Sequence, residues 1–194
     1  MAMVAVGVAA WAVFSQPTAN PESEGKSATQ AVSEAQALVQ AGLVQSQYQD
    51  FSGADRTFRR ALELDPDNKL AWYNLGVIAQ HDGRTADARK AYDKALKIDP
   101  TYASALFYEA VLLESSDPDQ AVALLKRAVA ADPKASTAYL RLGRALAKNG
   151  SDDEAEDAFR RAVAIDPKLH SLVPESFQDS VSPSPSTSQA GATR

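Results

Sequence analysis

Residue types that carry out chemistry are few in this 194-residue chain, and they lie far apart. The chain has no cysteine, which excludes disulfides, thiolate metal sites and a cysteine nucleophile. Its two histidines, His81 and His170, have no base, thiol or carboxylate cluster at the spacing of a metal site or a catalytic triad. No glycine-rich phosphate loop is present. We therefore predict a protein that is not an enzyme and uses no metal or cofactor.

Composition narrows the class of protein further. The net charge is −5 at pH 7 and the pI is about 5.1, which argues against a nucleic-acid partner, because such proteins carry a basic stripe. Hydrophobic residues make up 45% of the chain, as in globular proteins that bury a core. The length is enough for one such domain.

Residues 69–102 read as a helix, a turn and a second helix. Apolar residues recur at helical spacing from Leu70 to Ala79 and again from Ala86 to Ile98. Gly83 lies between the two runs, where a glycine can adopt the positive φ that ends a helix. Pro100 ends the second helix, since proline has no N–H to donate to the preceding turn.

The Asp-Pro pair that ends this second helix recurs along the chain. Asp-Pro occurs at 65–66, 99–100, 132–133 and 166–167, at separations of 34, 33 and 34 residues, which is typical of a solenoid. Residues 69–102 resemble a tetratricopeptide repeat. The residues that match its pattern are Trp72, Leu75, Gly76, Ala88, Tyr92, Ala95 and Pro100. The resemblance implies an all-α fold of four helical hairpins in a right-handed superhelix, at about 28–66, 69–100, 103–133 and 136–167.

Both ends of the chain differ from the repeats. Residues 15–27 are rich in Pro, Ser and Glu and are predicted to be an extended linker. Apolar residues at 168–177 can cover the last repeat as a short cap, or leave that end to self-associate. Residues 178–194 are rich in Ser, Pro and Thr and are predicted to be disordered.

The apolar run at residues 1–14 has three interpretations. As a helix it would span roughly 21 Å, short of the roughly 30 Å of a bilayer core. It is a membrane anchor, a signal peptide without the usual basic start, or an arm that packs on a partner. We favour membrane association, with the repeats outside the cytoplasm because no basic residue closely follows Phe14; the alternative is a cytoplasmic protein.

The resemblance also implies a concave groove lined by the first helix of each repeat. The residues that would line it and bind a partner are Val39, Leu43, Tyr73, Asn74, Val77, Phe107, Tyr108, Val111, Arg141 and Arg144. In the family, the asparagine matching Asn74 often bonds the backbone of an extended peptide. Tyrosine and arginine dominate many interfaces, so we expect Tyr73, Tyr108 and Arg141 to matter most. Some of these aromatic residues can instead pack against the next repeat.

Glu109 stands where the repeat usually has leucine, between the paired helices. It either pairs with a nearby base such as Lys126 or Arg127, reaches solvent, or is a functional buried carboxylate.

The function expected from these features is that of an adaptor, tethered to a membrane, whose groove binds a peptide or helix of another protein. The alternative is a structural subunit that self-associates or inserts into a larger complex.

Overall fold

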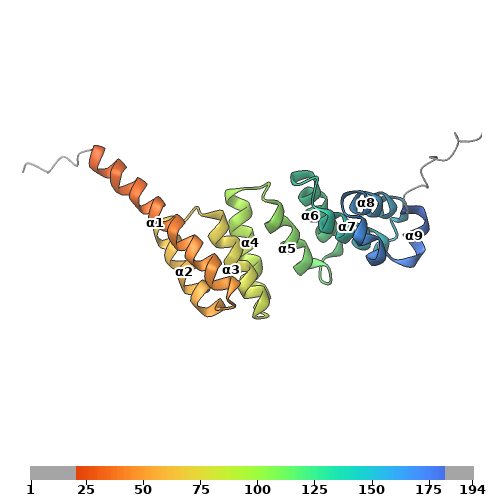
Figure 1. Cartoon of the computed structure of the whole chain (residues 1–194), viewed down its shortest axis with the longest axis horizontal. Coiled ribbons are helices and arrows are strands. Elements are labelled where there is room, and N and C mark those ends of the chain that lie inside the picture. Colours follow the sequence, from red (N-terminus) through yellow and green to blue (C-terminus); the bar gives the residue numbers. More distant parts are fainter. Residues whose placement is uncertain (1–20, 182–194) are drawn as a thin grey trace, which may run out of the picture.

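The computed structural model describes residues 21–181, and the regular elements there are all helices. They follow one another in a long row, in which each helix packs mainly on its neighbours in the chain (Figure 1). The elements are α1 Pro21–Gln47, α2 Phe51–Leu64, α3 Lys69–His81, α4 Thr85–Ile98, α5 Ala103–Leu113, α6 Pro118–Ala131, α7 Ser136–Lys148, α8 Asp152–Ile165, the 3₁₀ helix η1 Pro167–Leu172 and α9 Glu175–Val181.

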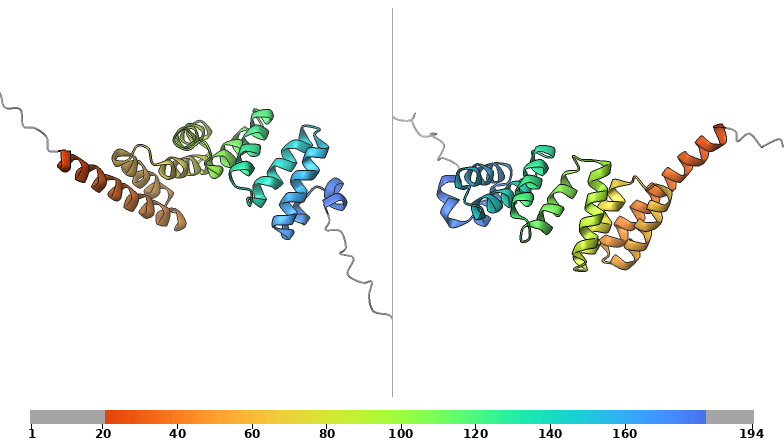
Figure 2. Two further views of the ribbon diagram at one scale, coloured as in Figure 1. Left: turned by 90° about the horizontal axis from the view of Figure 1, so that it is seen from above. Right: turned by 180° about the vertical axis from the view of Figure 1, so that it is seen from behind.

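The helices form four hairpins, α1–α2, α3–α4, α5–α6 and α7–α8, and the long helix α1 extends well beyond its partner (Figure 2). We call α1, α3, α5 and α7 the inner helices and α2, α4, α6 and α8 the outer helices. The predicted all-α solenoid is confirmed for the described part of the chain.

Each Asp-Pro pair ends an outer helix in the same way. Asp65, Asp99, Asp132 and Asp166 are the residues that follow the last helical residue. The N–H of each donates to the carbonyl four residues earlier, and φ lies between −129° and −138°. The next residue is proline, which cannot extend the helix.

The turns inside the hairpins also follow the sequence. Gly83 and Gly150 have φ of +73° and +74°, the left-handed conformation that glycine adopts without strain. Asp117 caps α6 by accepting from the N–H of Gln120 at 3.1 Å, and Pro118 occupies the first helical position, where no N–H is needed.

In three hairpins a glycine of the inner helix lies against an aromatic ring of the outer helix. A Cβ on Gly42, Gly76 or Gly143 would lie 2.7, 2.4 or 2.5 Å from the nearest ring atom, closer than atoms approach in proteins. The rings belong to Phe58, Tyr92 and Phe159, which are fully buried. Any side chain larger than hydrogen would therefore push the two helices of these hairpins apart.

The third hairpin fills the same place differently. Ala110 stands in register with Gly76 and Gly143, and Leu125 with Tyr92 and Phe159. Both Ala110 and Leu125 have no exposed surface. The larger residue on the inner helix is thus matched by a smaller one on the outer helix, which keeps the contact filled.

The buried apolar residues form three clusters along the row. The first joins α1, α2 and α3 and includes Ala91 of α4, and the second joins α3, α4 and α5. The third, which is the largest, runs from α5 to the C-terminal helix α9. The core is therefore a chain of local clusters rather than one central mass.

The two ends differ from the prediction. Helix α1 begins at Pro21, so the predicted linker at 15–27 is wrong for its last seven residues. Proline is favoured at a first helical position, which agrees with a helix that begins at Pro21. At the other end, η1 and α9 fold back on α8, with Phe177 5.2 Å from Phe159 between ring centroids. Helix α9 continues to Val181, so the predicted disorder from 178 is wrong for its first four residues.

Candidate functional site

The residues predicted to line the groove come from all four inner helices, and one of them is largely buried. Val39 is 3% exposed and belongs to the first core cluster, and it also lines a pocket between α1 and α3 that is described below. The others lie at the surface to different degrees. Arg144 is exposed, and the following are half-buried: Leu43, Tyr73, Asn74, Val77, Phe107, Tyr108, Val111 and Arg141.

An aromatic cluster joins the second and third hairpins. The ring of Tyr73 lies 5.3 Å from that of Tyr102, 5.8 Å from Tyr108 and 6.2 Å from Tyr92, measured between centroids. Phe107 meets Tyr108 edge to face at 5.3 Å. Such distances are those of stabilising aromatic pairs. The cluster therefore holds two hairpins together as well as presenting half-buried rings at the surface.

Tyr73 is at the centre of this cluster. Burial raises the pKa of its phenol well above the ordinary value, and the neighbouring Tyr108 and Tyr102 add to the rise. The phenol consequently stays neutral at physiological pH. Tyr92 below it is fully buried and donates its hydroxyl to Gln80 Oε1 at 2.8 Å. Removing the Tyr73 ring would disturb this packing as well as the surface.

Asn74 uses its amide within its own helix. Its Nδ2 donates to the carbonyl of Leu70 at 2.7 Å. One of the two N–H groups of this amide is therefore engaged by α3 itself. A role for Asn74 in binding a peptide backbone stays a prediction, and it would use the second N–H or Oδ1.

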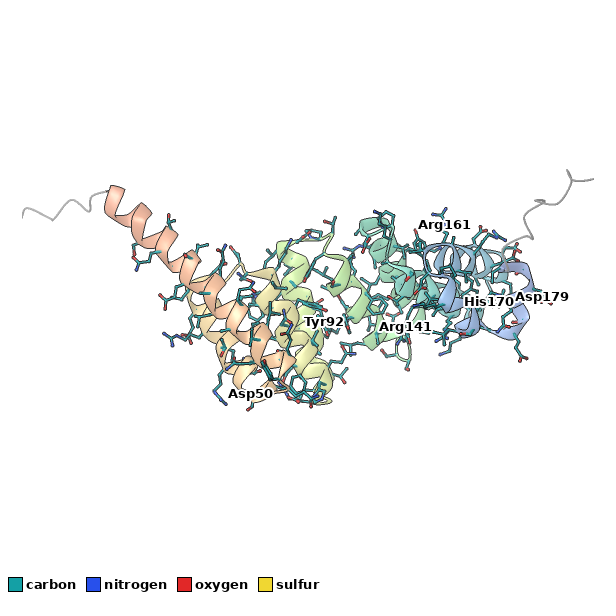
Figure 3. All side chains as sticks on the ribbon, viewed as in Figure 1. Asp50, Tyr92, Arg141, Arg161, His170 and Asp179 are labelled. Atoms are coloured by element: carbon teal, nitrogen blue, oxygen red, sulfur yellow. The ribbon has the colours of Figure 1, made fainter. Side chains whose placement is uncertain are left out.

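At the C-terminal end of the inner helices, a small pocket of about 120 Å³ opens between α5, α6 and α7. We call it the cationic pocket, and it is lined chiefly by Glu114, Pro118, Arg141, Arg144, Ala145 and Lys148. Nη1 of Arg141 donates to both carboxylate oxygens of Glu114, at 3.0 and 2.9 Å. The guanidinium also lies 6.0 Å from the centre of the Phe107 ring. In Figure 3, Arg141 is labelled at the lower edge of the C-terminal half of the molecule and Arg161 at its upper edge.

A wider pocket lies at the other end, between α1 and the start of α3. Its volume is about 560 Å³, and three carboxylates line it: Asp65, Asp67 and Asp99. We call it the acidic pocket. Lys69 Nζ lies 2.6 Å from an oxygen of Asp99, and this lysine and the hydroxyl and N–H of Thr101 lower the pKa of Asp99 to about 2. Asp99 therefore stays ionised at any physiological pH.

Two residues of these pockets were missed in the sequence. Lys148 follows Arg141 and Arg144 at seven and four residues on α7, a helical spacing that would have placed the three on one face. Glu114 is 27 residues from Arg141 and comes from another hairpin, so only the folded structure shows their pairing.

Glu109 is buried at 4% exposure, which rules out the solvent-exposed interpretation. Among the described residues, Glu109 has no ion pair. The two predicted partners are engaged elsewhere, since Lys126 bonds Glu154 and Arg127 donates to the carbonyl of Pro100. Burial raises the pKa of Glu109 to about 7, and the nearby charge of Asp93 raises it too, while Arg89 and Arg127 oppose the rise. The carboxyl therefore takes up its proton much closer to neutral pH than an ordinary glutamate does.

The histidines have ordinary surroundings. The His81 ring packs on Phe51, tilted by 36° with 4.3 Å between ring centroids, and lies 3.3 Å from a carboxylate oxygen of Asp82. His170 contacts the carbonyl of Gln178 at 3.2 Å in the C-terminal cap. Within residues 21–181, no group of histidine and carboxylate side chains has the arrangement of a metal site.

Helices that could cross a membrane are absent from the described residues, since none of them is both long and apolar enough. The apolar run at residues 1–14, on which the predicted membrane association depends, lies outside the described part.

Comparison with known proteins identifies the same repeat that the sequence pattern resembles. A family model described as tetratricopeptide repeat matches residues 32–103 and 111–170. A probable UDP-N-acetylglucosamine–peptide N-acetylglucosaminyltransferase SPINDLY of Solanum lycopersicum is 37% identical over 60 residues, which are 31% of this chain and 6% of that protein. A peroxisomal targeting signal receptor of Kluyveromyces lactis is 33% identical over 63 residues, which are 32% of this chain and 11% of the receptor. The chain thus spans a small part of these relatives.

A solved structure of PilF from Pseudomonas aeruginosa superimposes with a TM-score of 0.66 and 26% identity. The superposition covers 73% of this chain and 65% of that one. The likeness concerns the row of helical hairpins.

Proposed function

The chain belongs to the tetratricopeptide repeat family, and we propose that it is a non-enzymatic adaptor whose inner helices bind a peptide or helix of a partner protein. The observation that carries this proposal is the surface shared by the inner helices. It combines half-buried rings of the aromatic cluster with a pocket at each end. Aromatic residues and arginine are the side chains on which binding energy most often depends.

Val111 is the best probe of this surface. It is half-buried on α5, one turn from Tyr108, and takes no part in the three core clusters. Its side chain can therefore be changed with little effect on packing. A glutamate there would place a charge where an apolar part of the partner is expected.

The similarity to a targeting signal receptor supports a peptide as the partner. That receptor's name describes recognition of a signal, and this chain matches it within the repeats. A peptide that lies along the inner helices could reach both the aromatic cluster and the cationic pocket.

The test is a crosslinking pull-down of the full chain from its source cells, with Val111→Glu and Ala130→Glu compared. Ala130 is exposed on the outer helix α6, so its variant adds the same charge on the opposite face. We expect Val111→Glu to lose the captured partner, and Ala130→Glu to keep it. Both should retain wild-type helicity and melting temperature. Capture by both variants would refute binding at the inner helices.

A second candidate function is self-assembly through α1. Ala37, Ala41 and Val44 follow each other at helical spacing on α1, and all are exposed, Val44 at 50%. In later hairpins the corresponding face is covered by the preceding repeat. Sedimentation should then give dimers or larger species that Val44→Glu dissociates. A monomer at every concentration would exclude this candidate.

Tethering to a membrane through residues 1–14 is part of the proposal and depends on the sequence alone. Full-length protein should sediment with membranes and resist extraction with alkaline carbonate. The chain without residues 1–14 should stay in the supernatant. Equal distribution of the two forms would favour the cytoplasmic alternative.

A further inference from the structure

The inner helices differ in charge. Three positions of α7 have equivalents in the other three repeats. In and just after α1, α3 and α5 the equivalent residues are neither acidic nor lysine nor arginine: Gln40, Leu43, Gln47, Asn74, Val77, His81, Tyr108, Val111 and Ser115. On α7 all three are basic: Arg141, Arg144 and Lys148. The positive charge of the surface is therefore concentrated on the fourth hairpin.

The cationic pocket is where these three side chains meet. Its lining has three cations and one carboxylate, Glu114, although the chain as a whole has a net charge of −5. Pro118, Ala121 and Ala145 form its apolar part. A pocket of about 120 Å³ with this lining suits a short side chain that ends in a negative group.

The three cations are engaged to different degrees. Arg141 is held by Glu114, with side chains 41% and 32% exposed. Arg144 donates to the carbonyl of Leu172 in the C-terminal cap. Lys148 forms no ion pair within the described residues. An incoming carboxylate could thus bind Lys148 and Arg144 without breaking the pair between Arg141 and Glu114.

We propose that the cationic pocket binds aspartate or glutamate side chains of the partner, so that the partner segment is acidic where it passes α7. This inference rests on the proposed function and adds the chemistry of the partner. Charge complementarity selects the occupant, because the other inner helices have no lysine or arginine at the equivalent positions. Glu114 acts as a fixed competitor that limits the affinity for acidic segments.

The probes are three fluorescein-labelled peptides of equal length in which leucine alternates with glutamate, glutamine or lysine. Anisotropy with the full chain should show tightest binding of the glutamate peptide. Raising the salt from about 50 to about 300 mM should weaken this binding, because exposed charges are screened. Arg144→Gln and Lys148→Gln should each weaken it by about 3- to 10-fold.

Two further variants make the test specific. Glu114→Gln should strengthen binding of the glutamate peptide, since it removes the competing carboxylate. Lys97→Gln, which removes one exposed lysine from the outer helix α4, should leave binding unchanged. Equal affinity for the glutamate and glutamine peptides, or equal effects of Lys97→Gln and Lys148→Gln, would overturn the proposal.

Failure of this inference is distinguishable from failure of the proposed function. If Val111→Glu loses the natural partner but Arg144→Gln with Lys148→Gln captures it as well as wild type, the adaptor stands and the acidic segment is wrong. If the glutamate peptide binds through Lys148 but no partner depends on Val111, the pocket stands and the adaptor is wrong.

Discussion

The second and third hairpins have the same architecture but fill the same contact with different side chains. In α3–α4, Gly76 lets the ring of Tyr92 pack directly on the helix backbone. In α5–α6, Ala110 and Leu125 share the space, and Glu109 stands beside them in place of the leucine that precedes Gly76. The comparison teaches that the repeat preserves the filled volume of a contact rather than the residues in it. It also shows that a charge can enter this layer at a cost that depends on pH.

The largest expected effect on the free energy of unfolding comes from placing the alanine and leucine of the third hairpin at Gly76 and Tyr92 of the second. Gly76→Ala should cost about 1–3 kcal/mol by overpacking, and Tyr92→Leu about 2–3 kcal/mol by leaving space. The double variant should lose less than the sum, because each change relieves the other. Urea unfolding of the four proteins measures this coupling. Strict additivity would mean that the two residues do not form one packing unit.

The next effect concerns Glu109 and pH. Its pKa is raised by burial and by Asp93 on α4, against Arg89 on α4 and Arg127 on α6. The folded protein therefore binds more protons than the unfolded chain between pH 4.5 and 7. The free energy of unfolding should fall by about 2–3 kcal/mol as the pH rises from about 5 to about 8.

Two variants isolate that contribution. Glu109→Leu, which restores the residue of the second and fourth hairpins, should be more stable than wild type at the higher pH. Its stability should also depend less on pH, and Glu109→Gln should share that reduced dependence. Chemical unfolding at both pH values checks this. A pH dependence that survives in Glu109→Leu would assign it to other groups.

A smaller effect is expected for the reverse change in the third hairpin. Ala110→Gly should cost about 1 kcal/mol, since it removes a buried methyl group and lowers helix propensity. The same change should improve tolerance of Leu125→Phe, because the ring would then have the space that Gly143 gives Phe159. Thermal melting of Leu125→Phe in the wild-type and the Ala110→Gly backgrounds measures this difference. A Leu125→Phe variant equally destabilised in both would break the comparison.

The smallest effects belong to exposed lysine pairs. Lys69 bonds Asp99 and Lys126 bonds Glu154, each at 2.6 Å. Replacing either lysine with alanine should cost under about 1 kcal/mol, because solvent and salt screen such pairs. The difference should shrink further at high salt. A larger loss at Lys69 would point to its contact with the Tyr102 ring, 5.3 Å away.

Much of this fold could be predicted because its signals are local. The Asp-Pro pairs mark where outer helices end, and Gly83 and Gly150 mark turns by their required φ. Asp117 and Pro118 act within one turn of helix. Such features depend on residues a few positions apart, which a sequence displays directly.

The surface was less predictable because it depends on contacts between hairpins. Val39 has the apolar character of a groove residue, but it is buried in the cluster that joins the first two hairpins. Tyr73 was expected to contact a partner, and its neighbours in space include Tyr92 of α4 and Tyr102 just before α5. One N–H of the Asn74 amide is engaged by its own helix. The end of the linker was missed because a Pro- and Glu-rich start suits both a helix N-terminus and an extended chain.

The division of the core into three clusters bears on how the molecule opens. Because each cluster joins only neighbouring hairpins, amide protons need not exchange in a single global event. The N-terminal hairpin, with its small cluster, should exchange with solvent before α7 and α8, which lie in the largest cluster and under the C-terminal cap. A protease or a pulling force would then take the chain apart from α1, while the hairpin that carries the cationic pocket stays folded longest.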